Sequence, residues 1–267
     1  MKVKRSFLKW TGSKRYLVPQ IENLMPSKIE TYYEPFLGSG IVLTAASQKA
    51  VRLVGSDVSS TLMDLWNLVK HDPYKIINHY ETLWKQEASK IYYDIRTRFN
   101  KTRDPLDFYF LTRTCINGLI RFNQKGEFNS SYHYAGREGM IPKSVQNVIL
   151  EWHKFLCKYD VMLQHNSYEH IFDKVKKNDF VFLDPPYNNS ANRMYEKYIS
   201  SNDIMEILEK LNSIDCKWLL TYDGFTNGTD LTFDFDKSLY KTHGYFAVAK
   251  SAWQKRHAVQ ESYYTNY

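Results

Sequence analysis

The sequence predicts an α/β fold with a largely helical insertion. Residues 31–37 are expected to form a strand, which leads through a glycine-containing turn into a helix over the Ala-, Val- and Leu-rich stretch 41–50. A second buried strand is predicted at 179–183, where Asp-Phe-Val-Phe-Leu forms an apolar run. Between these segments, from residue 62 to about 99, apolar residues recur at helical spacing. The helical segment therefore interrupts an α/β domain.

The first β-turn-α unit carries a nucleotide-binding pattern. Its turn is Gly38-Ser39-Gly40, and the next predicted strand, 51–55, is followed by Asp57. In nucleotide-binding α/β folds an acidic residue about twenty positions after the glycines binds ribose hydroxyls, and the glycines let the ligand approach the backbone. Without Asp57 the turn would be interpreted as a packing feature; with it, a ribose-bearing ligand is favoured.

The insertion is expected to contain several helices and one exposed hairpin. The helical pattern from 62 to about 99 breaks near Asp72-Pro73, and a further helix is expected from Pro105 to about Gly118. Apolar and polar residues then alternate over 121–129 around a glycine-containing turn, as in a β-hairpin.

A last helix closes the insertion. It is expected after Pro142 and runs to Tyr159, and strand character resumes at 161–163. We therefore predict an α/β domain formed by 1–60 and 160–267, with 61–159 as a second domain.

The tetrapeptide Asp184-Pro185-Pro186-Tyr187 follows directly on the buried strand 179–183. It lies at the carboxyl end of that strand, which is where ligands bind in open α/β sheets. Two prolines fix φ and remove two backbone donors, so the turn offers a carboxylate, a bare carbonyl and an aromatic face. This combination suits an amine on a flat ring. In the alternative interpretation, the prolines only end the strand and Tyr187 packs under a loop.

The charge of the chain indicates a polyanionic partner. The formal net charge is +7 over 267 residues, of which 43% are hydrophobic, enough for one large core or for one core and a small attached domain. The basic excess is uneven, because six basic residues precede the first acidic one: Lys2, Lys4, Arg5, Lys9, Lys14 and Arg15. Nucleic acid is favoured over a membrane, since no amphipathic basic helix stands out; the alternative is a merely basic soluble protein.

The cysteines and the hydropathy argue against a metal, disulfide or membrane protein. Cys115, Cys157 and Cys216 lie far apart, without the spacing of a zinc site or a disulfide framework. No apolar run approaches a membrane span, and the basic N-terminus lacks a signal peptide's apolar stretch. We expect a soluble, cytoplasmic protein that binds no metal.

Taken in order, these motifs resemble those of the Dam-type (D12 class) DNA adenine-N6 methyltransferases. The segments that carry the resemblance span nearly the whole chain: 7–14 (Phe-Leu-Lys-Trp-Thr-Gly-Ser-Lys), 34–40 (Glu-Pro-Phe-Leu-Gly-Ser-Gly), Asp57, 113–123 (Arg-Thr-Cys-Ile-Asn-Gly-Leu-Ile-Arg-Phe-Asn), 126–129 (Gly-Glu-Phe-Asn), 184–187, Glu261 and 266–267.

The resemblance implies a Rossmann-like methyltransferase fold, with a mixed, mostly parallel sheet, helices on both faces, and S-adenosyl-L-methionine as methyl donor. It makes 1–60 and 160–267 the catalytic domain and 61–159 the target-recognition domain, in a cytoplasmic protein of a bacterial or phage-infected cell. Lys14 would bind the methionine carboxylate and Asp57 the ribose hydroxyls; the alternatives are a solvated Lys14 and a core Trp10. The donor-binding set is Trp10, Lys14, Phe36, Gly38, Ser39, Gly40, Asp57 and Asp184.

The chemistry that the resemblance implies is an in-line displacement on a sulfonium methyl group by the exocyclic amine of adenine. Asp184 and the carbonyl of Pro185 would each accept one N–H of this weakly nucleophilic amine, and Tyr187 would stack on the base. Pro186 completes the catalytic turn. Because the amine cannot be reached inside a duplex, the adenine must be flipped out.

Sequence recognition is expected in the hairpin. Arg121 is the candidate for a bidentate contact to guanine, with a phosphate contact as the alternative. The predicted DNA-binding residues are Leu119, Arg121, Asn123, Lys125 and Arg137, and Lys143 is also assigned to phosphates. The chain departs from GATC-specific relatives at 130–134 and at Ile116. We therefore expect a short site containing GA, with GATC as the favoured form.

Two alternatives remain open on the sequence alone. One is a methyltransferase acting on another amine, such as cytosine N4 or a protein amide, although related motifs then tend to begin with Asn or Ser instead of Asp184. The other is a catalytically silent DNA-binding module, against which the intact Asp57 and Asp184 argue. We expect a monomer acting on double-stranded DNA, and a cognate restriction endonuclease is compatible with the sequence.

Overall fold

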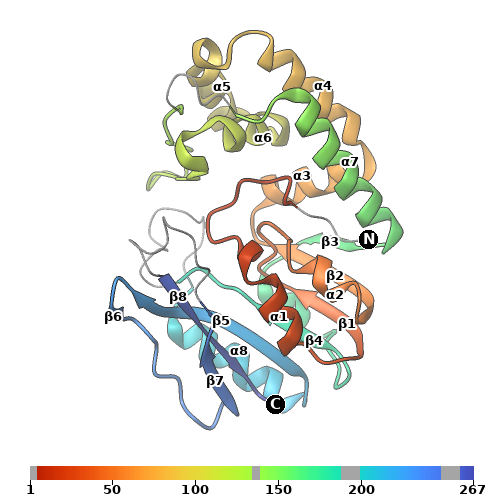
Figure 1. Ribbon diagram of the computed structural model, residues 1–267, viewed down its shortest axis with the longest axis vertical. Helices are drawn as coiled ribbons and strands as arrows, with labels where there is room; N and C mark the ends of the chain where they lie inside the picture. The colour runs from red at the N-terminus through yellow and green to blue at the C-terminus, as the bar shows by residue number, and fades with distance from the viewer. Residues whose placement is uncertain (1–4, 134–138, 188–198, 248–258) are drawn as a thin grey trace.

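The fold is organised around one mixed β-sheet (Figure 1). The computed structural model describes residues 5–133, 139–187, 199–247 and 259–267. In this part of the chain the strand order is β3-β2-β1-β4-β5-β8-β7, and β6 pairs with β5. The strands are β1 (Ile29–Glu34), β2 (Ala50–Asp57), β3 (Met162–His165), β4 (Phe180–Leu183), β5 (Lys217–Thr226), β6 (Thr229–Asp230), β7 (Thr242–Tyr245) and β8 (Val259–Thr265).

The five strands from β3 to β5 are parallel, and β6, β7 and β8 pair antiparallel. The chain adds β2 and β3 on one side of β1, and β4 and β5 on the other. The order reverses between β1 and β4, and this reversal opens a crevice at the carboxyl ends of the two strands. This topology and the helices around it confirm the predicted mixed, mostly parallel α/β fold.

The helices fall into two groups. The first group lies near the sheet: η1 (Lys14–Tyr16), α1 (Val18–Leu24), α2 (Leu43–Ala46), η3 (Tyr168–Ile171) and α8 (Ser201–Ser213). The second group comes from the middle of the chain: α3 (Ser60–His71), α4 (Pro73–Trp84), α5 (Ala88–Thr102), α6 (Pro105–Thr114), η2 (Ile116–Gly118) and α7 (Pro142–Lys158). Figure 1 shows α5 and α6 at the end of this group farthest from the sheet, and α4 alongside α7.

Alternating side chains on the strands supply two hydrophobic cores. In β4, Phe180 and Phe182 face one core, and Val181 and Leu183 face the other. The first core extends through helices α3–α7, whereas the second packs against α8. Because β4 is buried on both faces, its residues are all apolar. The first core runs without a break from the sheet into the helical segment, and the division at residues 60 and 159 stays a prediction.

Several element boundaries differ from the sequence prediction. The strand expected at 31–37 is shifted and ends at Glu34, because Pro35 cannot continue the ladder. The helix expected at 41–50 is reduced to α2, since β2 already begins at Ala50. The helix expected to reach Gly118 ends at Thr114, where the backbone turns and Asn117 adopts a φ of 53°.

The predicted hairpin is present as a short ladder. Phe122 and Phe128 form an antiparallel bridge, and the amide of Asn129 donates to the carbonyl of Arg121 at 2.9 Å. Gly126 occupies the turn with a φ of 73°, a conformation that glycine adopts without a steric penalty. We call residues 115–133 the recognition loop.

Candidate active site

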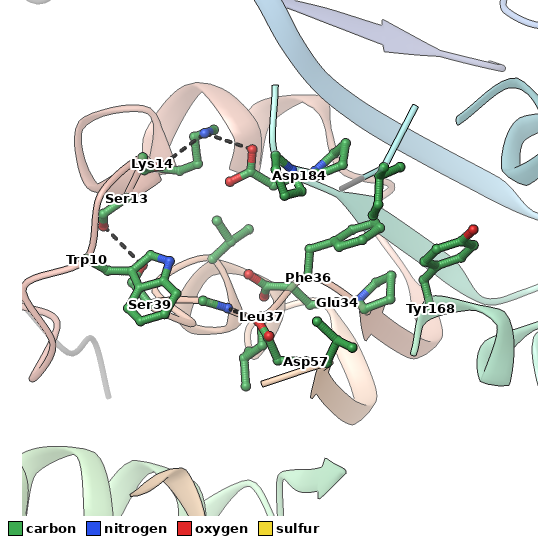
Figure 2. A pocket seen from close by; sticks show the side chains of 18 of the residues that line it. Trp10, Ser13, Lys14, Glu34, Phe36, Leu37, Ser39, Asp57, Tyr168 and Asp184 are labelled. Carbon is green, nitrogen blue, oxygen red and sulfur yellow. Dashed lines mark hydrogen bonds and ion pairs between the residues drawn. The ribbon is translucent and has the colours of Figure 1, made fainter. Parts of the chain in front are cut away.

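A cavity of about 850 Å³ opens at the carboxyl ends of β1 and β4. The loops after β1, β2 and β4 and the N-terminal loop 10–14 line it (Figure 2). Most residues of the predicted donor-binding set, together with the whole tetrapeptide, line this one cavity: Trp10, Lys14, Phe36, Gly38, Ser39, Asp57, Asp184, Pro185, Pro186 and Tyr187. Residues far apart in sequence therefore meet at the point where the strand order reverses.

The glycine turn is shaped by two tryptophans. Gly38 has a φ of +44°, and a Cβ placed there would lie 2.7 Å from the indole nitrogen of Trp10. Gly40 has a φ of +59°, and its Cβ would lie 2.6 Å from the ring of Trp66. Trp66 also donates from Nε1 to the Gly38 carbonyl at 3.1 Å. Gly40 thus packs against α3 and supports the turn, whereas Gly38 lines the cavity.

Asp57 is held by two backbone amides. One carboxylate oxygen accepts from the Gly38 amide at 3.0 Å, and the other accepts from the Ser59 amide at 3.1 Å. The N-terminal loop is tied to the same turn, because the hydroxyls of Ser13 and Ser39 lie 3.0 Å apart. Figure 2 shows Asp57 across the cavity from Lys14 and Asp184.

Lys14 is buried beside Asp184. Its Nζ lies 2.8 Å from Asp184 Oδ1 and 3.1 Å from Glu261 Oε2, with the side chain only 3% exposed. Burial alone would lower the pKa of Lys14, but the two carboxylates outweigh it and raise that pKa. Lys14 is therefore not a solvated surface charge.

Burial is also the largest influence on the pKa values of the two titratable residues of the tetrapeptide, Asp184 and Tyr187. It raises the pKa of Asp184, against the opposing attraction of Lys14. It likewise raises the pKa of Tyr187, which Asp184 and Glu261 raise further. The Tyr187 hydroxyl donates to Glu261 Oε2 at 2.8 Å. Tyr187 lines the cavity, and its ring packs against that of Tyr222, with the two centroids 5.5 Å apart.

The sequence predictions gave no site role to Glu34 and Tyr168, which line the cavity, or to Glu261, which contacts Lys14 and Tyr187 beside it. Glu34 ends β1, is 3% exposed, and accepts from the Tyr32 hydroxyl at 2.9 Å. Burial raises the pKa of Glu34 well above its usual range. Tyr168 of η3 lines the cavity next to Phe36, with the two ring centroids 5.8 Å apart. Glu261 was noted only as part of the family resemblance, because nothing in its local sequence links β8 to the tetrapeptide.

The recognition loop forms a separate polar hollow of about 1000 Å³. Its lining includes four of the five predicted DNA-binding residues, Leu119, Arg121, Asn123 and Lys125. The side chains of Arg121, Asn123 and Lys125 are exposed and that of Leu119 is half-buried. Arg137 lies outside the described residues. Lys143 is exposed at the start of α7.

Helix α5 anchors the recognition loop. Asn100 donates to the Phe128 carbonyl at 3.0 Å and accepts from the Phe128 amide at 2.7 Å. Arg103 donates to the Gly126 carbonyl at 2.6 Å. Three hydrogen bonds from α5 and the residue that follows it therefore fix the backbone of the loop.

The described residues contain neither a membrane-spanning helix nor a metal-binding cluster. No helix of the described chain is both long and apolar enough to cross a membrane. In the described ranges, no group of three or more His, Cys, Asp or Glu side chains is arranged to hold a metal ion.

Comparison with known proteins agrees with this arrangement. Residues 10–258 match the family model described as D12 class N6 adenine-specific DNA methyltransferase. The chain belongs to this family. It is 32% identical over 249 residues to the type II methyltransferase M.MjaIII of Methanocaldococcus jannaschii, covering 81% of this chain and 83% of that protein.

Two further D12-class similarities are to proteins named DNA adenine methylase. The Vibrio cholerae protein is 30% identical over 196 residues, and the Escherichia coli K12 protein is 31% identical over 207 residues. Each alignment covers 70% of this chain and 66% of the relative. The chain is thus an adenine-specific DNA methyltransferase, and its substrate is the N6 amine of adenine in DNA.

Proposed function

We propose that the chain transfers the methyl group of S-adenosyl-L-methionine to an adenine flipped out of double-stranded DNA, within a short site containing GA, GATC being the favoured form. One observation carries the proposal: Asp184-Pro185-Pro186-Tyr187 shares a single cavity with Asp57 and the Gly38-Ser39 turn. A donor in this cavity and an amine at the tetrapeptide would be neighbours.

The cavity suits a nucleoside donor in size and in chemistry. Its volume of about 850 Å³ lies within the usual range for small-molecule sites. A side chain at position 38 would collide with Trp10, so the glycine leaves a flat floor. Asp57 would accept hydrogen bonds from the ribose hydroxyls, while Phe36 and Tyr168 provide apolar walls for a purine. When bound, S-adenosyl-L-methionine supplies an electrophilic methyl group on a sulfonium.

The tetrapeptide would activate the amine by accepting its hydrogens. Asp184 and the Pro185 carbonyl accept one N–H each, which directs the nitrogen lone pair toward the methyl group and stabilises the positive charge that develops. Tyr187 would stack on the base. No base inside a duplex can reach these acceptors, so the adenine leaves the helix at a cost of a few kcal/mol.

The contacts of Lys14 favour a role other than the one that the family resemblance implies. Its ammonium already contacts Asp184 and Glu261. We therefore propose that Lys14 supports Asp184, with the methionine carboxylate as a further partner only if the donor displaces one of these contacts.

The test of the reaction uses the purified chain, S-adenosyl-L-methionine carrying a labelled methyl group, and unmethylated double-stranded DNA. We expect label in N6-methyladenine, identified by mass spectrometry of the digested nucleosides. Label in N4-methylcytosine, or in no nucleoside, would contradict the proposal.

A variant tests the donor site. Asp57→Ala should weaken S-adenosyl-L-methionine binding by at least about tenfold, because the ribose hydroxyls lose their acceptor. Calorimetric titration measures this, with Asp64→Ala, an exposed carboxylate on α3, as the control. Equal affinities of the wild type and Asp57→Ala would remove Asp57 from the donor site.

A further inference from the structure

We propose that Glu261 is a positioning residue, which holds Lys14 and Tyr187 so that one carboxylate oxygen of Asp184 is fixed and the other faces the substrate amine. This inference rests on the proposed function, since it assigns Asp184 to the amine. Glu261 belongs to β8, close to the end of the chain, and its carboxylate reaches the tetrapeptide from the antiparallel part of the sheet.

The protein itself satisfies all three protons of the Lys14 ammonium. Nζ contacts Asp184 Oδ1 at 2.8 Å and Glu261 Oε2 at 3.1 Å, and donates to the Gly12 carbonyl at 3.0 Å. A lysine ammonium has three donors and no acceptor. Lys14 is therefore fixed by three contacts, of which Glu261 supplies one.

Tyr187 is held by the same carboxylate. Its hydroxyl lies 2.8 Å from Glu261 Oε2 and 3.3 Å from Asp184 Oδ1. A phenol has one proton to donate, and the shorter contact is to Glu261. The Lys14 ammonium lies 5.1 Å from the centre of the Tyr187 ring. Glu261 thus sets the position of both groups that flank Asp184.

The two carboxylate oxygens of Asp184 differ in the contacts that they make. Oδ1 accepts from the Thr221 hydroxyl at 2.7 Å and receives the contacts from Lys14 and Tyr187. Over the described residues, no hydrogen bond or ion pair engages Oδ2. With Oδ1 fixed on one side, Oδ2 is the oxygen available to a substrate N–H.

The sheet places Glu261 at a β-bulge. In the pairing of β5 with β8, Tyr222 faces Ser262 and Phe225 faces Gln260, so the pair Asp223-Gly224 faces Glu261 alone. A Cβ on Gly224 would lie 2.1 Å from the Gln260 carbonyl oxygen, and this position therefore requires glycine. Bulges of this kind are common beside active sites, where they direct a side chain.

The negative charge of Glu261 also affects the pKa of Asp184. Burial and Glu261 both raise the pKa of Asp184, whereas Lys14 lowers it. The titratable groups that face Asp184 are Lys14 from the N-terminal loop, Glu261 from β8, Tyr187 from its own loop, and Glu34 and Tyr32 from β1. Removing the Glu261 charge should therefore disturb the geometry while making Asp184 easier to ionise.

The experiment compares single-turnover methylation by the wild type, Glu261→Gln, Tyr187→Phe and the double variant across pH. Glu209→Gln, an exposed carboxylate on α8, is the control for the charge change. We expect Glu261→Gln to lower the plateau rate by about tenfold, with affinities for DNA and donor within about twofold. The acid limb of its pH profile should move to lower pH. The double variant should be no slower than Glu261→Gln, because the two side chains share one contact.

The outcomes separate the two proposals. A plateau rate that Glu261→Gln leaves unchanged overturns the positioning role. So does a lower plateau rate without a shift of the acid limb of the pH profile. A double variant whose loss of rate equals the combined losses of Glu261→Gln and Tyr187→Phe also overturns it. A wild type that methylates no adenine overturns the proposed function instead.

Discussion

The cavity at the carboxyl ends of β1 and β4 and the recognition loop hold their polar side chains in different ways. In the cavity, Lys14 and Thr221 contact one oxygen of Asp184, and Lys14 is 3% exposed. In the recognition loop, the side chains of Arg121 and Lys125 are exposed, and no hydrogen bond or ion pair with the described residues engages either one. The groups assigned to chemistry are paired before substrate arrives, whereas the two cationic side chains assigned to DNA are not; the Asn123 amide of the same loop is paired, because it donates to Glu127 at 2.7 Å.

This difference follows from what each region must do. A catalytic carboxylate stabilises developing charge best when it does not reorganise during the reaction, so contacts made in advance are useful. A side chain that contacts a base edge needs its donors free for the DNA, and desolvating them is repaid only on binding. Five variants in and around the two regions test this account.

The largest effect is expected at the cavity. Asp184→Ala removes the acceptor for the amine, so the single-turnover rate should fall by about three orders of magnitude, while the affinity for DNA changes little. Rapid-quench methylation on a saturating duplex measures the rate, and Asp64→Ala is the control. If Asp184→Ala kept even about a tenth of the wild-type rate, the assigned role would be wrong.

The next effect is expected beneath the recognition loop. Asp107 of α6 is fully buried and accepts two hydrogen bonds from Arg98 of α5 and one from His79 of α4. Asp107→Asn should lower the free energy of unfolding by about 1–3 kcal/mol, because the buried side chain loses charge-assisted hydrogen bonds while Arg98, 49% exposed, stays solvated. Denaturant unfolding measures this, and Asp94→Asn, exposed on α5, should change little.

The same carboxylate gives a pH dependence with a definite sign. Burial would raise the pKa of Asp107, but the hydrogen bonds from Arg98 and His79 outweigh burial and hold it below 3.8. The folded pKa is lower than the unfolded one, so the stabilisation is present above pH 3.8 and is lost as the pH falls through the folded pKa. An Asp107→Asn variant that loses stability equally at all pH values would contradict this.

The smallest effect is expected at Glu34 and has the opposite sign. Burial raises its folded pKa above the unfolded value of 4.5, so its contribution to stability falls as the pH rises above that value. Glu34→Gln resembles the protonated carboxyl and can still accept from Tyr32. Its melting temperature should equal or exceed that of the wild type at pH 8 and approach it at lower pH. A Glu34→Gln protein that melts well below the wild type at pH 8 would contradict this prediction.

The sequence predicted which strand ends meet at the cavity, but not which side chains contact one another there. The carboxyl ends of parallel strands lie at one edge of a sheet, so Asp57 after β2 and Asp184 after β4 could be placed on the same edge from their positions after apolar runs. Burial on both faces made those runs continuous and easy to recognise. The pairing of Lys14 with Asp184 could not be predicted, because it depends on how the N-terminal loop crosses the strand ends.

The place of Glu261, in the antiparallel part of the sheet, could not be predicted for a related reason. Glu261 reaches the tetrapeptide only through the pairing of β8 with β5 and the bulge at Asp223-Gly224, and such long-range register has no local signal. Tyr168 was missed in the same way, since it follows the short strand β3 in a 3-10 helix. The ends of α2 and α6 were predicted too late, because their apolar residues continue beyond the point where the backbone turns.

The most direct test of the contrast between the two regions is the pattern of N6-methyladenine on plasmid DNA from cells expressing the wild type, Arg121→Ala or Lys125→Ala. Sequencing that detects the modified base supplies the pattern. We expect wild-type methylation at adenines preceded by G, spread of methylation to other adenines in Arg121→Ala, and an unchanged pattern with weaker methylation in Lys125→Ala. Wild-type methylation at adenines without a neighbouring G, or an Arg121→Ala protein that loses methylation equally at every site, would contradict the account.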